Sequence, residues 1–231
     1  MRVRTLWWTP CAVPGSAAAR TGRQAAVAKP KLAIDVSNFW LPGPVSDRAA
    51  FAFMDEAQMD GVKRVIAGTQ IPSVCNQQLV AAANCGMDIQ AYVQLSWSHD
   101  WYDIFRQFDN TSGARWAVGD LPVSMLWVAL EGEPKRDYVH THSLISEAIR
   151  AAKRHGFKKV GLYTNPSWWA EKMGNTRDFR SYPFWLAYYD DVADRRVGPV
   201  VGGWSGRYAP RMKQYNQNRN LAGMNVDWNV Y

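Results

Sequence analysis

The stretch Ser124-Met-Leu-Trp-Val-Ala-Leu-Glu131 is the part of the sequence that decides the fold. Residues 125–130 are all apolar, and such a run is typical of a strand in a parallel sheet that is covered on both faces. Side chains alternate along a strand, so Trp127, Ala129 and Glu131 share one face. A carboxylate at the mouth of an apolar strand is partly desolvated, which raises its pKa and suits it to acid catalysis. Glu131 is therefore a candidate catalytic residue.

Short apolar runs recur on both sides of this stretch and alternate with amphipathic segments. They predict strands at residues 32–36, 62–67, 87–95, 124–130, 159–164, 183–188, 211–215 and 225–230, and helices at residues 46–60, 73–85 and 137–155. Eight strands with intervening helices predict an α/β fold, a parallel (β/α)-barrel of the TIM type over residues 32–231. The connections after the sixth strand are short and polar, so we expect fewer than eight helices.

Two more carboxylates lie in predicted strands, Asp35 near the end of the first and Asp227 in the last. Asp35 follows Ile34, where the alternative role is an Asx turn or a helix cap. Asp227 is flanked by Val226 and Trp228, whose apolar character indicates a packed closing strand with Asp227 facing inward. Active sites of such barrels lie at the carboxyl ends of the strands. We therefore expect Asp35, Glu131 and Asp227 to meet there.

Aromatic residues are abundant, with 12 Trp and 10 Tyr. Core packing accounts for many of them, but aromatic faces also bind the apolar faces of sugar rings. Those that fall at the ends of predicted strands are Tyr92, Trp97, Tyr163, Trp185, Tyr188 and Tyr215. Their repeated placement at one rim predicts a sugar-binding cleft.

The net charge of +7 belongs to one end of the chain. Residues 1–31 hold six of the 27 Lys and Arg and no Asp or Glu, so the remaining 200 residues carry only +1. We predict a basic N-terminal arm or linker (residues 1–31) and a barrel that does not bind nucleic acid, because the basic surface that nucleic acid requires is missing. The arm resembles a secretory signal or a transit peptide, and docking on a protein partner is the third interpretation.

No other cofactor or membrane signal stands out. Three Cys make no disulfide framework, so buried thiols are expected. His140 and His142 are two residues apart, which points them in different directions on a helix, and no metal site is predicted. The sequence has no Gly-rich phosphate loop, and no apolar run approaches the ~20 residues of a membrane span.

The order of these pieces resembles glycoside hydrolase family 25, the lysozyme-type muramidases. The matching segments are Ala33-Ile-Asp-Val-Ser-Asn38, Leu126-Trp-Val-Ala-Leu-Glu131, Val160-Gly-Leu-Tyr-Thr164, Phe184-Trp-Leu-Ala-Tyr188, Met212-Lys-Gln-Tyr215 and Val226-Asp-Trp-Asn229. The resemblance implies that Glu131 is the general acid/base and that Asp35 and Asp227 line the −1 subsite. It implies that the glycan groove is shaped by Tyr163, Trp185, Tyr188 and Gln214. It also implies a peptidoglycan substrate and no cofactor.

The chain departs from the family pattern at one position. The family has Asp-x-Glu at the end of the fourth strand, and this chain has Ala129-Leu130-Glu131. The absent carboxylate would orient the substrate acetamido group, and loss of one such partner commonly slows catalysis by about 10²–10³-fold. Two hypotheses follow: an impaired muramidase-like domain, extracellular or associated with the cell wall, or a non-catalytic glycan-binding or structural module such as a bacteriophage virion or tail component.

Overall fold

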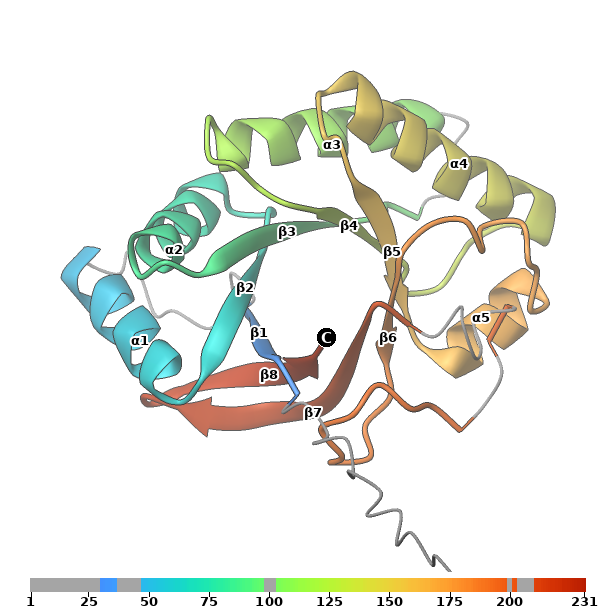
Figure 1. The fold of residues 1–231 in the computed structure, drawn as a ribbon. Helices are drawn as coiled ribbons and strands as arrows, with labels where there is room; N and C mark the ends of the chain where they lie inside the picture. The colour runs from blue at the N-terminus through green and yellow to red at the C-terminus, as the bar shows by residue number, and fades with distance from the viewer. Residues whose placement is uncertain (1–29, 37–46, 98–102, 199–200, 203–209) are drawn as a thin grey trace, which may run out of the picture.

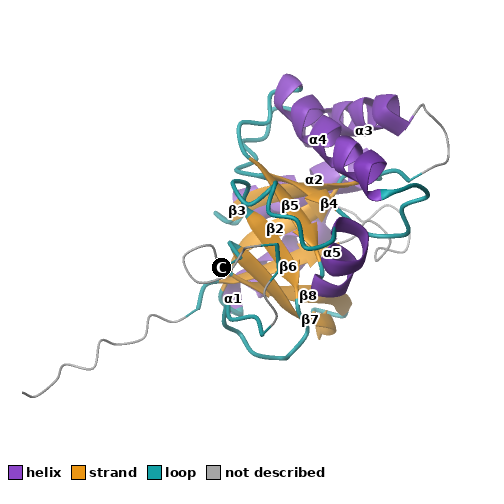
Figure 2. Cartoon of the chain, turned by 90° about the vertical axis from the view of Figure 1, so that its right-hand side faces the viewer, coloured by secondary structure: helices purple, strands orange, loops and turns teal. Residues whose placement is uncertain are grey.

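The computed structural model describes residues 30–36, 47–97, 103–198, 201–202 and 210–231 and shows a closed eight-stranded barrel (Figure 1). The strands are β1 (Leu32–Val36), β2 (Val62–Gly68), β3 (Asp88–Gln94), β4 (Leu126–Ala129), β5 (Val160–Thr164), β6 (Phe184–Ala187), β7 (Met212–Leu221) and β8 (Met224–Val230). The helices lie outside the strands (Figure 2) and are α1 (Asp47–Met59), α2 (Pro72–Asn84), α3 (Asp103–Val118), α4 (Tyr138–Arg154) and α5 (Pro166–Met173). The predicted α/β barrel is confirmed, with five helices in the described residues. The predicted arm lies outside them, except for its last two residues.

The last strand corrects the expectation of a fully parallel barrel. Strands β1 to β7 run parallel to their successive neighbours, whereas β8 is antiparallel to both β7 and β1. The strands β7 and β8 form a hairpin joined by Ala222 and Gly223, which have φ angles of 51° and 80°. Such positive φ values are typical of two-residue hairpin turns. The reversal makes Asp227 the cross-strand neighbour of Asp35.

Two helices were not among the predicted elements. In α3 the buried residues include the polar Gln107 and Thr111, while Phe105 and Trp116 are 60% and 75% exposed. Hydrophobic periodicity therefore gives no signal for this helix. Helix α5 is eight residues long, too short for a clear period, although it begins with the capping sequence Asn165-Pro166.

The barrel wall separates two apolar cores. Trp127 and Ala129 point inward with Trp185 and Tyr163, whereas Val128 and Leu130 pack between the strands and the helices. This arrangement agrees with the predicted alternation along β4. The inner core is tight near β5, because a Cβ atom on Gly161 would lie 2.4 Å from the Trp127 ring. Glycine there makes room for the indole.

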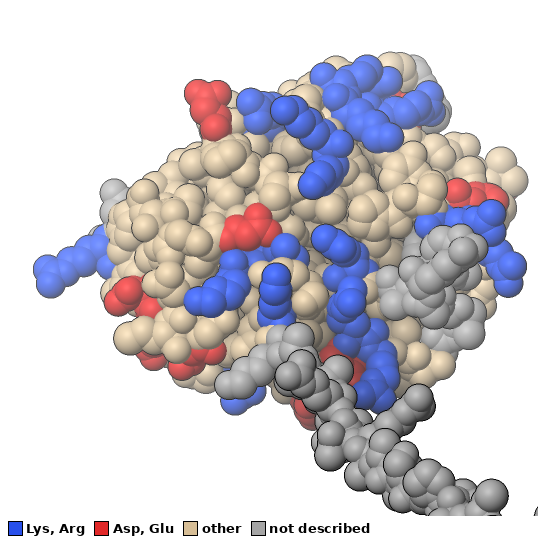
Figure 3. All heavy atoms as spheres, in the orientation of Figure 1, with Lys and Arg blue, Asp and Glu red and all other residues tan. Residues whose placement is uncertain are grey.

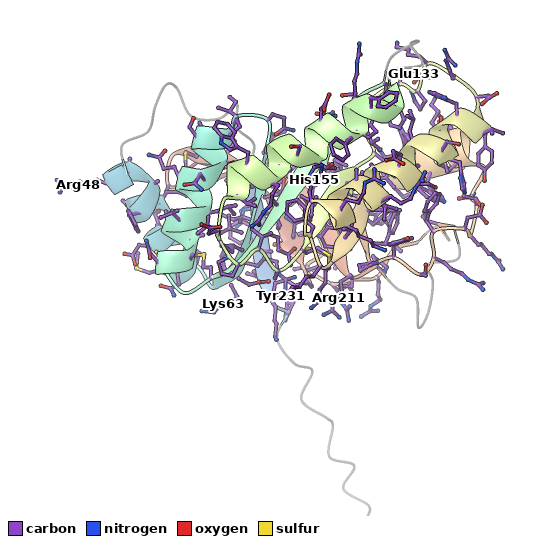
Figure 4. The ribbon with its side chains drawn as sticks, turned by 90° about the horizontal axis from the view of Figure 1, so that it is seen from above. Arg48, Lys63, Glu133, His155, Arg211 and Tyr231 are labelled. Carbon is purple, nitrogen blue, oxygen red and sulfur yellow. The ribbon has the colours of Figure 1, made fainter. Side chains whose placement is uncertain are left out.

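The two ends of the barrel differ. Lys63, Arg211 and Tyr231 lie at one end, and Glu133 lies at the other (Figure 4). Figure 3 views the end with the C-terminus, where many Lys and Arg side chains gather, so the expectation that the barrel has no basic surface is not met at this end. The chain also enters β1 at this end, because the Tyr231 backbone N–H donates to the Lys31 carbonyl at 3.1 Å. The carboxyl ends of the parallel strands therefore open on the opposite face.

The described thiols are unpaired. Cys75 is buried and Cys85 is half-buried, and both are free, while Cys11 lies outside the described residues. Burial raises the pKa of Cys75 to about 12. Within the described part of the chain, no helix has the length and apolarity to cross a bilayer.

Candidate active site

A hydrogen-bonded network centred on Gln214 lies where the barrel strands end. The Gln214 amide nitrogen donates to Asp35 Oδ2 at 2.9 Å and to Asp227 Oδ2 at 3.1 Å. Its carbonyl oxygen accepts from the Tyr163 hydroxyl at 2.8 Å and from the Tyr189 hydroxyl at 2.9 Å. Gln214 is 1% exposed, so its four polar contacts are all made inside the protein. Three residues predicted from different parts of the chain, Asp35, Asp227 and Tyr163, thus share one partner.

The two aspartates form a carboxyl pair with raised pKa values. Burial raises the pKa of Asp35 well above its usual range, and the neighbouring Asp227 raises it further. Hydrogen bonds donated by Asn229, at 2.7 Å, and by Gln214 oppose this shift. Burial also raises the pKa of Asp227, while the Asn218 backbone N–H, 2.8 Å from its Oδ1, lowers it. Like charges on adjacent strands disfavour full ionisation of both groups, so the pair retains a proton more readily than isolated carboxyls do.

Glu131 lies at the rim of the barrel, just after β4. Partial burial raises its pKa, a hydrogen bond with Tyr163 lowers it, and the charge of Asp227 raises it again. The Tyr163 hydroxyl contacts both the Glu131 carboxylate and the Gln214 carbonyl, and it can donate its single proton to only one of them at a time. Glu131 is therefore connected through Tyr163 and Gln214 to both aspartates. A carboxyl group with a raised pKa at the mouth of a pocket is suited to donating a proton.

Ala129 occupies the inward-facing position two residues before Glu131. It is 1% exposed and packs in the inner core. Its cross-strand neighbours are Gln94 on β3 and Tyr163 on β5. A methyl group offers no hydrogen bond and no charge, so the position beside Glu131 is apolar, as the sequence predicts.

A pocket of about 590 Å³ opens next to this network. It is lined by Glu131, Tyr163, Asn165, Pro166, Ser167, Ala170, Ala187, Tyr188 and Tyr189. The pocket thus joins the rim glutamate to the first turn of α5 and to the residues that follow β6. The predicted residues Tyr163 and Tyr188 both contribute to its wall.

A buried lysine anchors the loop that follows Tyr188 and Tyr189. Lys213 on β7 has a fully buried side chain, and its Nζ lies 2.9 Å from Asp190 Oδ2 and 3.5 Å from Asp194 Oδ1. The Nζ also donates to the Arg196 carbonyl at 3.0 Å. This ion-paired group fixes the loop beside the pocket.

Several predicted aromatic residues take other places. Trp185 is 1% exposed, its indole donates to Asn229 Oδ1 at 2.7 Å, and its ring packs in the inner core. Tyr92 is half-buried and meets the Trp185 ring edge-on at 6.5 Å. Tyr215 points to the outer core, because Gln214 takes the inward position on β7. Trp97 lies at the backbone of Glu131, to which its indole donates a hydrogen bond. Neither Trp185 nor Tyr215 is among the residues that line the pocket described above, and their groove role stays a prediction.

Sequence reasoning missed three contributors. Asn229 stands two residues after Asp227, so period-two alternation could have placed it on the same face. Tyr189 follows the predicted sixth strand by one residue, and no sequence signal shows that its hydroxyl turns inward. Trp168 donates its indole N–H to the Gly132 carbonyl at 2.8 Å, which depends on the unpredicted helix α5. Among the described residues, no group of three His, Cys, Asp or Glu side chains is arranged to hold a metal ion.

Comparison with known proteins identifies relatives of this chain. A family model described as Lysozyme-like protein 1 matches residues 45–200, more than half of the chain. The chain is similar to Probable GH family 25 lysozyme 5 of Dictyostelium discoideum, with 32% identity over 112 residues that form 47% of this chain and 50% of that protein. It is also similar to Counting factor 50 of the same organism, with 33% identity over 119 residues, 47% of this chain and 36% of that protein. The chain spans about half or less of the length of these curated relatives.

Solved structures share the architecture. A muramidase from Acremonium alcalophilum superposes with a TM-score of 0.65 at 18% identity, covering 86% of this chain and 92% of that one. The modular autolysin LytC of Streptococcus pneumoniae, in complex with a synthetic peptidoglycan ligand, gives a TM-score of 0.64 at 14% identity, covering 87% of this chain and 46% of that one. At such identities the likeness shows the fold.

Proposed function

The chain belongs to the lysozyme-like family of glycoside hydrolase family 25, and on that premise we propose that it is a peptidoglycan-directed muramidase-like domain whose hydrolysis is limited by Ala129. The observation that carries the proposal is the Gln214 network, which ties Asp35, Asp227 and Tyr163 together beside the Glu131 pocket. Glycosidases of this kind need a carboxylic acid beside the leaving oxygen and further carboxylates that stabilise the developing positive charge.

Each residue of the site has a distinct role in the proposed hydrolysis. Glu131, whose pKa is raised, donates a proton to the glycosidic oxygen and later accepts one from water. Asp35 and Asp227 stabilise positive charge at the sugar ring and accept hydrogen bonds from it. Tyr188 and Tyr189 offer pocket-lining rings beside them. Ala129 leaves the acetamido group without the carboxylate that would orient it, which predicts slow turnover.

The substrate class is supported by the relatives. One structural neighbour is described as a muramidase, and another, the modular autolysin LytC, was solved with a synthetic peptidoglycan ligand. Glycan strands of peptidoglycan are accordingly the substrate we propose for this chain. An extracellular or wall-associated location follows from that substrate as part of the same proposal.

A second candidate function rests on Ala129. A glycan-binding or structural module that does not hydrolyse its ligand would keep the barrel, the pocket and the Gln214 network without needing the missing carboxylate. One relative carries the name Counting factor 50, which is not an enzyme name. The bacteriophage location and a protein partner for the arm stay predictions under this alternative.

The test compares three proteins on purified bacterial cell walls, with release of reducing ends as the readout. We expect slow release by the natural chain, background release by Glu131→Gln, and a gain of about 10²–10³-fold by Ala129→Asp. Equal urea-unfolding midpoints would show that all three are folded. Background release by all three proteins would reject the muramidase proposal. Retained wall binding by the same proteins would then support the glycan-binding module that does not hydrolyse its ligand.

A further inference from the structure

The backbone around Glu131 is held by side chains from three separate elements. Three consecutive carbonyl groups accept side-chain hydrogen bonds: Leu130 from Thr164 Oγ1 at 3.1 Å, Glu131 from the Trp97 indole, and Gly132 from the Trp168 indole at 2.8 Å. From this geometry we infer that Trp97 and Trp168, here called the indole pair, are positioning residues that fix the direction of the Glu131 side chain. The inference rests on the proposed role of Glu131 as the acid/base.

The two indoles support each other. Their ring centroids are 5.7 Å apart with the planes tilted by 36°. Trp168 is 7% exposed, and Trp97 is half-buried. Packing alone would require no particular direction of the ring nitrogens, yet both N–H groups point at adjacent carbonyls of one short segment. The direction of the two donors is what distinguishes the pair from ordinary core aromatics.

Helix α5 holds the same segment at a second point. The Trp168 backbone N–H donates to Asn165 Oδ1 at 2.9 Å, which caps the helix and sets where the indole lies. One turn later, Lys172 Nζ lies 2.6 Å from Glu133 Oε1. Residues 132 and 133 therefore both contact side chains of α5.

Gly132 allows the close approach that this contact needs. Its φ is 84°, in the left-handed region that favours glycine. A Cβ atom at this position would lie 3.3 Å from Cδ1 and 3.5 Å from Nε1 of Trp97. The indole thus packs directly on the backbone next to Glu131.

The apolar residue at position 129 makes backbone anchoring by the indole pair more important for the direction of the Glu131 carboxylate. Ala129 cannot share a proton with Glu131 or hydrogen bond to it, so the direction of the carboxylate depends on its backbone and on Tyr163. Reacting groups that are misplaced by about 1 Å commonly lose about 100-fold in rate. Anchoring of the backbone on both sides of Glu131 limits such displacement.

The test uses substitutions that keep a ring and remove the donor. Trp97→Phe and Trp168→Phe each lose one indole–carbonyl hydrogen bond. Trp169→Phe is the matched control, because Trp169 is the next residue of α5 and is fully buried. Its indole N–H donates to the Thr176 carbonyl at 3.2 Å rather than to the backbone around Glu131. Two readouts are measured in the full chain: the Glu131 titration by carbon-13 carboxyl NMR, and wall hydrolysis in the natural and Ala129→Asp backgrounds.

We expect Trp97→Phe and Trp168→Phe to move the Glu131 titration toward the ordinary value of a glutamate, 4.5, and to lower kcat by about 10–100-fold with little change in KM. Trp169→Phe should leave both readouts unchanged. An unshifted titration in both variants would overturn the inference. If Trp168→Phe fails to fold, the half-buried Trp97 variant decides alone. Absence of hydrolysis in every protein would reject the proposed function, and the NMR titration would still decide whether the indole pair positions Glu131.

Discussion

Replacing Asp35 by Asn should make the protein more stable at neutral pH, although it removes a residue of the proposed site. Asp35 and Asp227 are direct neighbours on antiparallel strands, where Cβ atoms lie about 4.5–5.5 Å apart. At about 5 Å and an effective dielectric constant of about 20, two full charges repel by about 3 kcal/mol. The hydrogen bonds from Asn229 and Gln214 become neutral in the variant and each weakens by about 1 kcal/mol. A net gain of about 1–2 kcal/mol remains once relief from burying the charge is included.

The sign of this effect depends on pH. The folded protein raises the pKa of Asp35, so it binds a proton that the unfolded chain has released. Stability from this group is present below the ordinary value of 3.8 and is lost as the pH rises through the folded value. The gain in Asp35→Asn should therefore be large near pH 7 and small near pH 4.

Urea unfolding of both proteins at the two pH values measures the effect. Asp88→Asn is the control, because Asp88 lies 2.6 Å from Arg64 Nε and its loss removes an attraction. That variant should lose up to about 1 kcal/mol near pH 7, the opposite sign. An equal loss of stability in Asp35→Asn at both pH values would refute the reasoning, since it would mean that the Asp35 charge is not repelled.

Two further predictions concern the barrel wall and the loop beside the pocket. Gly161→Ala should lower the free energy of unfolding by about 1–3 kcal/mol, because the new methyl group would overlap the Trp127 ring. Gly113→Ala, in the middle of α3 with open space around it, should raise it by up to about 1 kcal/mol, and the same sign in both variants would contradict the packing argument. Lys213→Met should cost about 3 kcal/mol, at the low end for a broken buried pair because Asp190 and Asp194 are 30% and 33% exposed. Thermal unfolding measures it, and a loss no larger than that of Lys172→Met, whose ion pair with Glu133 is more exposed, would show that the loop is held by other contacts.

Much of the barrel could be predicted because its strands carry a strong signal. The continuous apolar run of β4 and the alternation through Trp127, Ala129 and Glu131 depend only on local sequence. Residues 216–220, by contrast, are all polar and are typical of a loop, yet they extend β7 because the hairpin partner β8 supplies their backbone hydrogen bonds. The direction of β8 also depended on the turn at Ala222 and Gly223, and this dipeptide is a weaker hairpin signal than Asn-Gly.

The site was predictable to the extent that it follows strand ends. Glu131 ends an apolar run, Asp35 and Asp227 lie between apolar strand residues, and all three belong to the network. The side of the barrel wall that the Tyr215 ring faces could not be predicted, because a position at a strand end does not determine it. Trp168 could not be placed without α5. The role of Gln214 as the shared partner depends on contacts with Asp35, 179 positions away in the sequence, which no local pattern reveals.

The antiparallel course of β8 also determines how the protein can be coupled to a linker or a solid support. Because β1 begins and β8 ends side by side on the basic face, a linker fused to Tyr231 would leave from the side away from the carboxylates. A bead or electrode coupled through Tyr231 would leave the pocket turned toward the solution, open to an insoluble polymer.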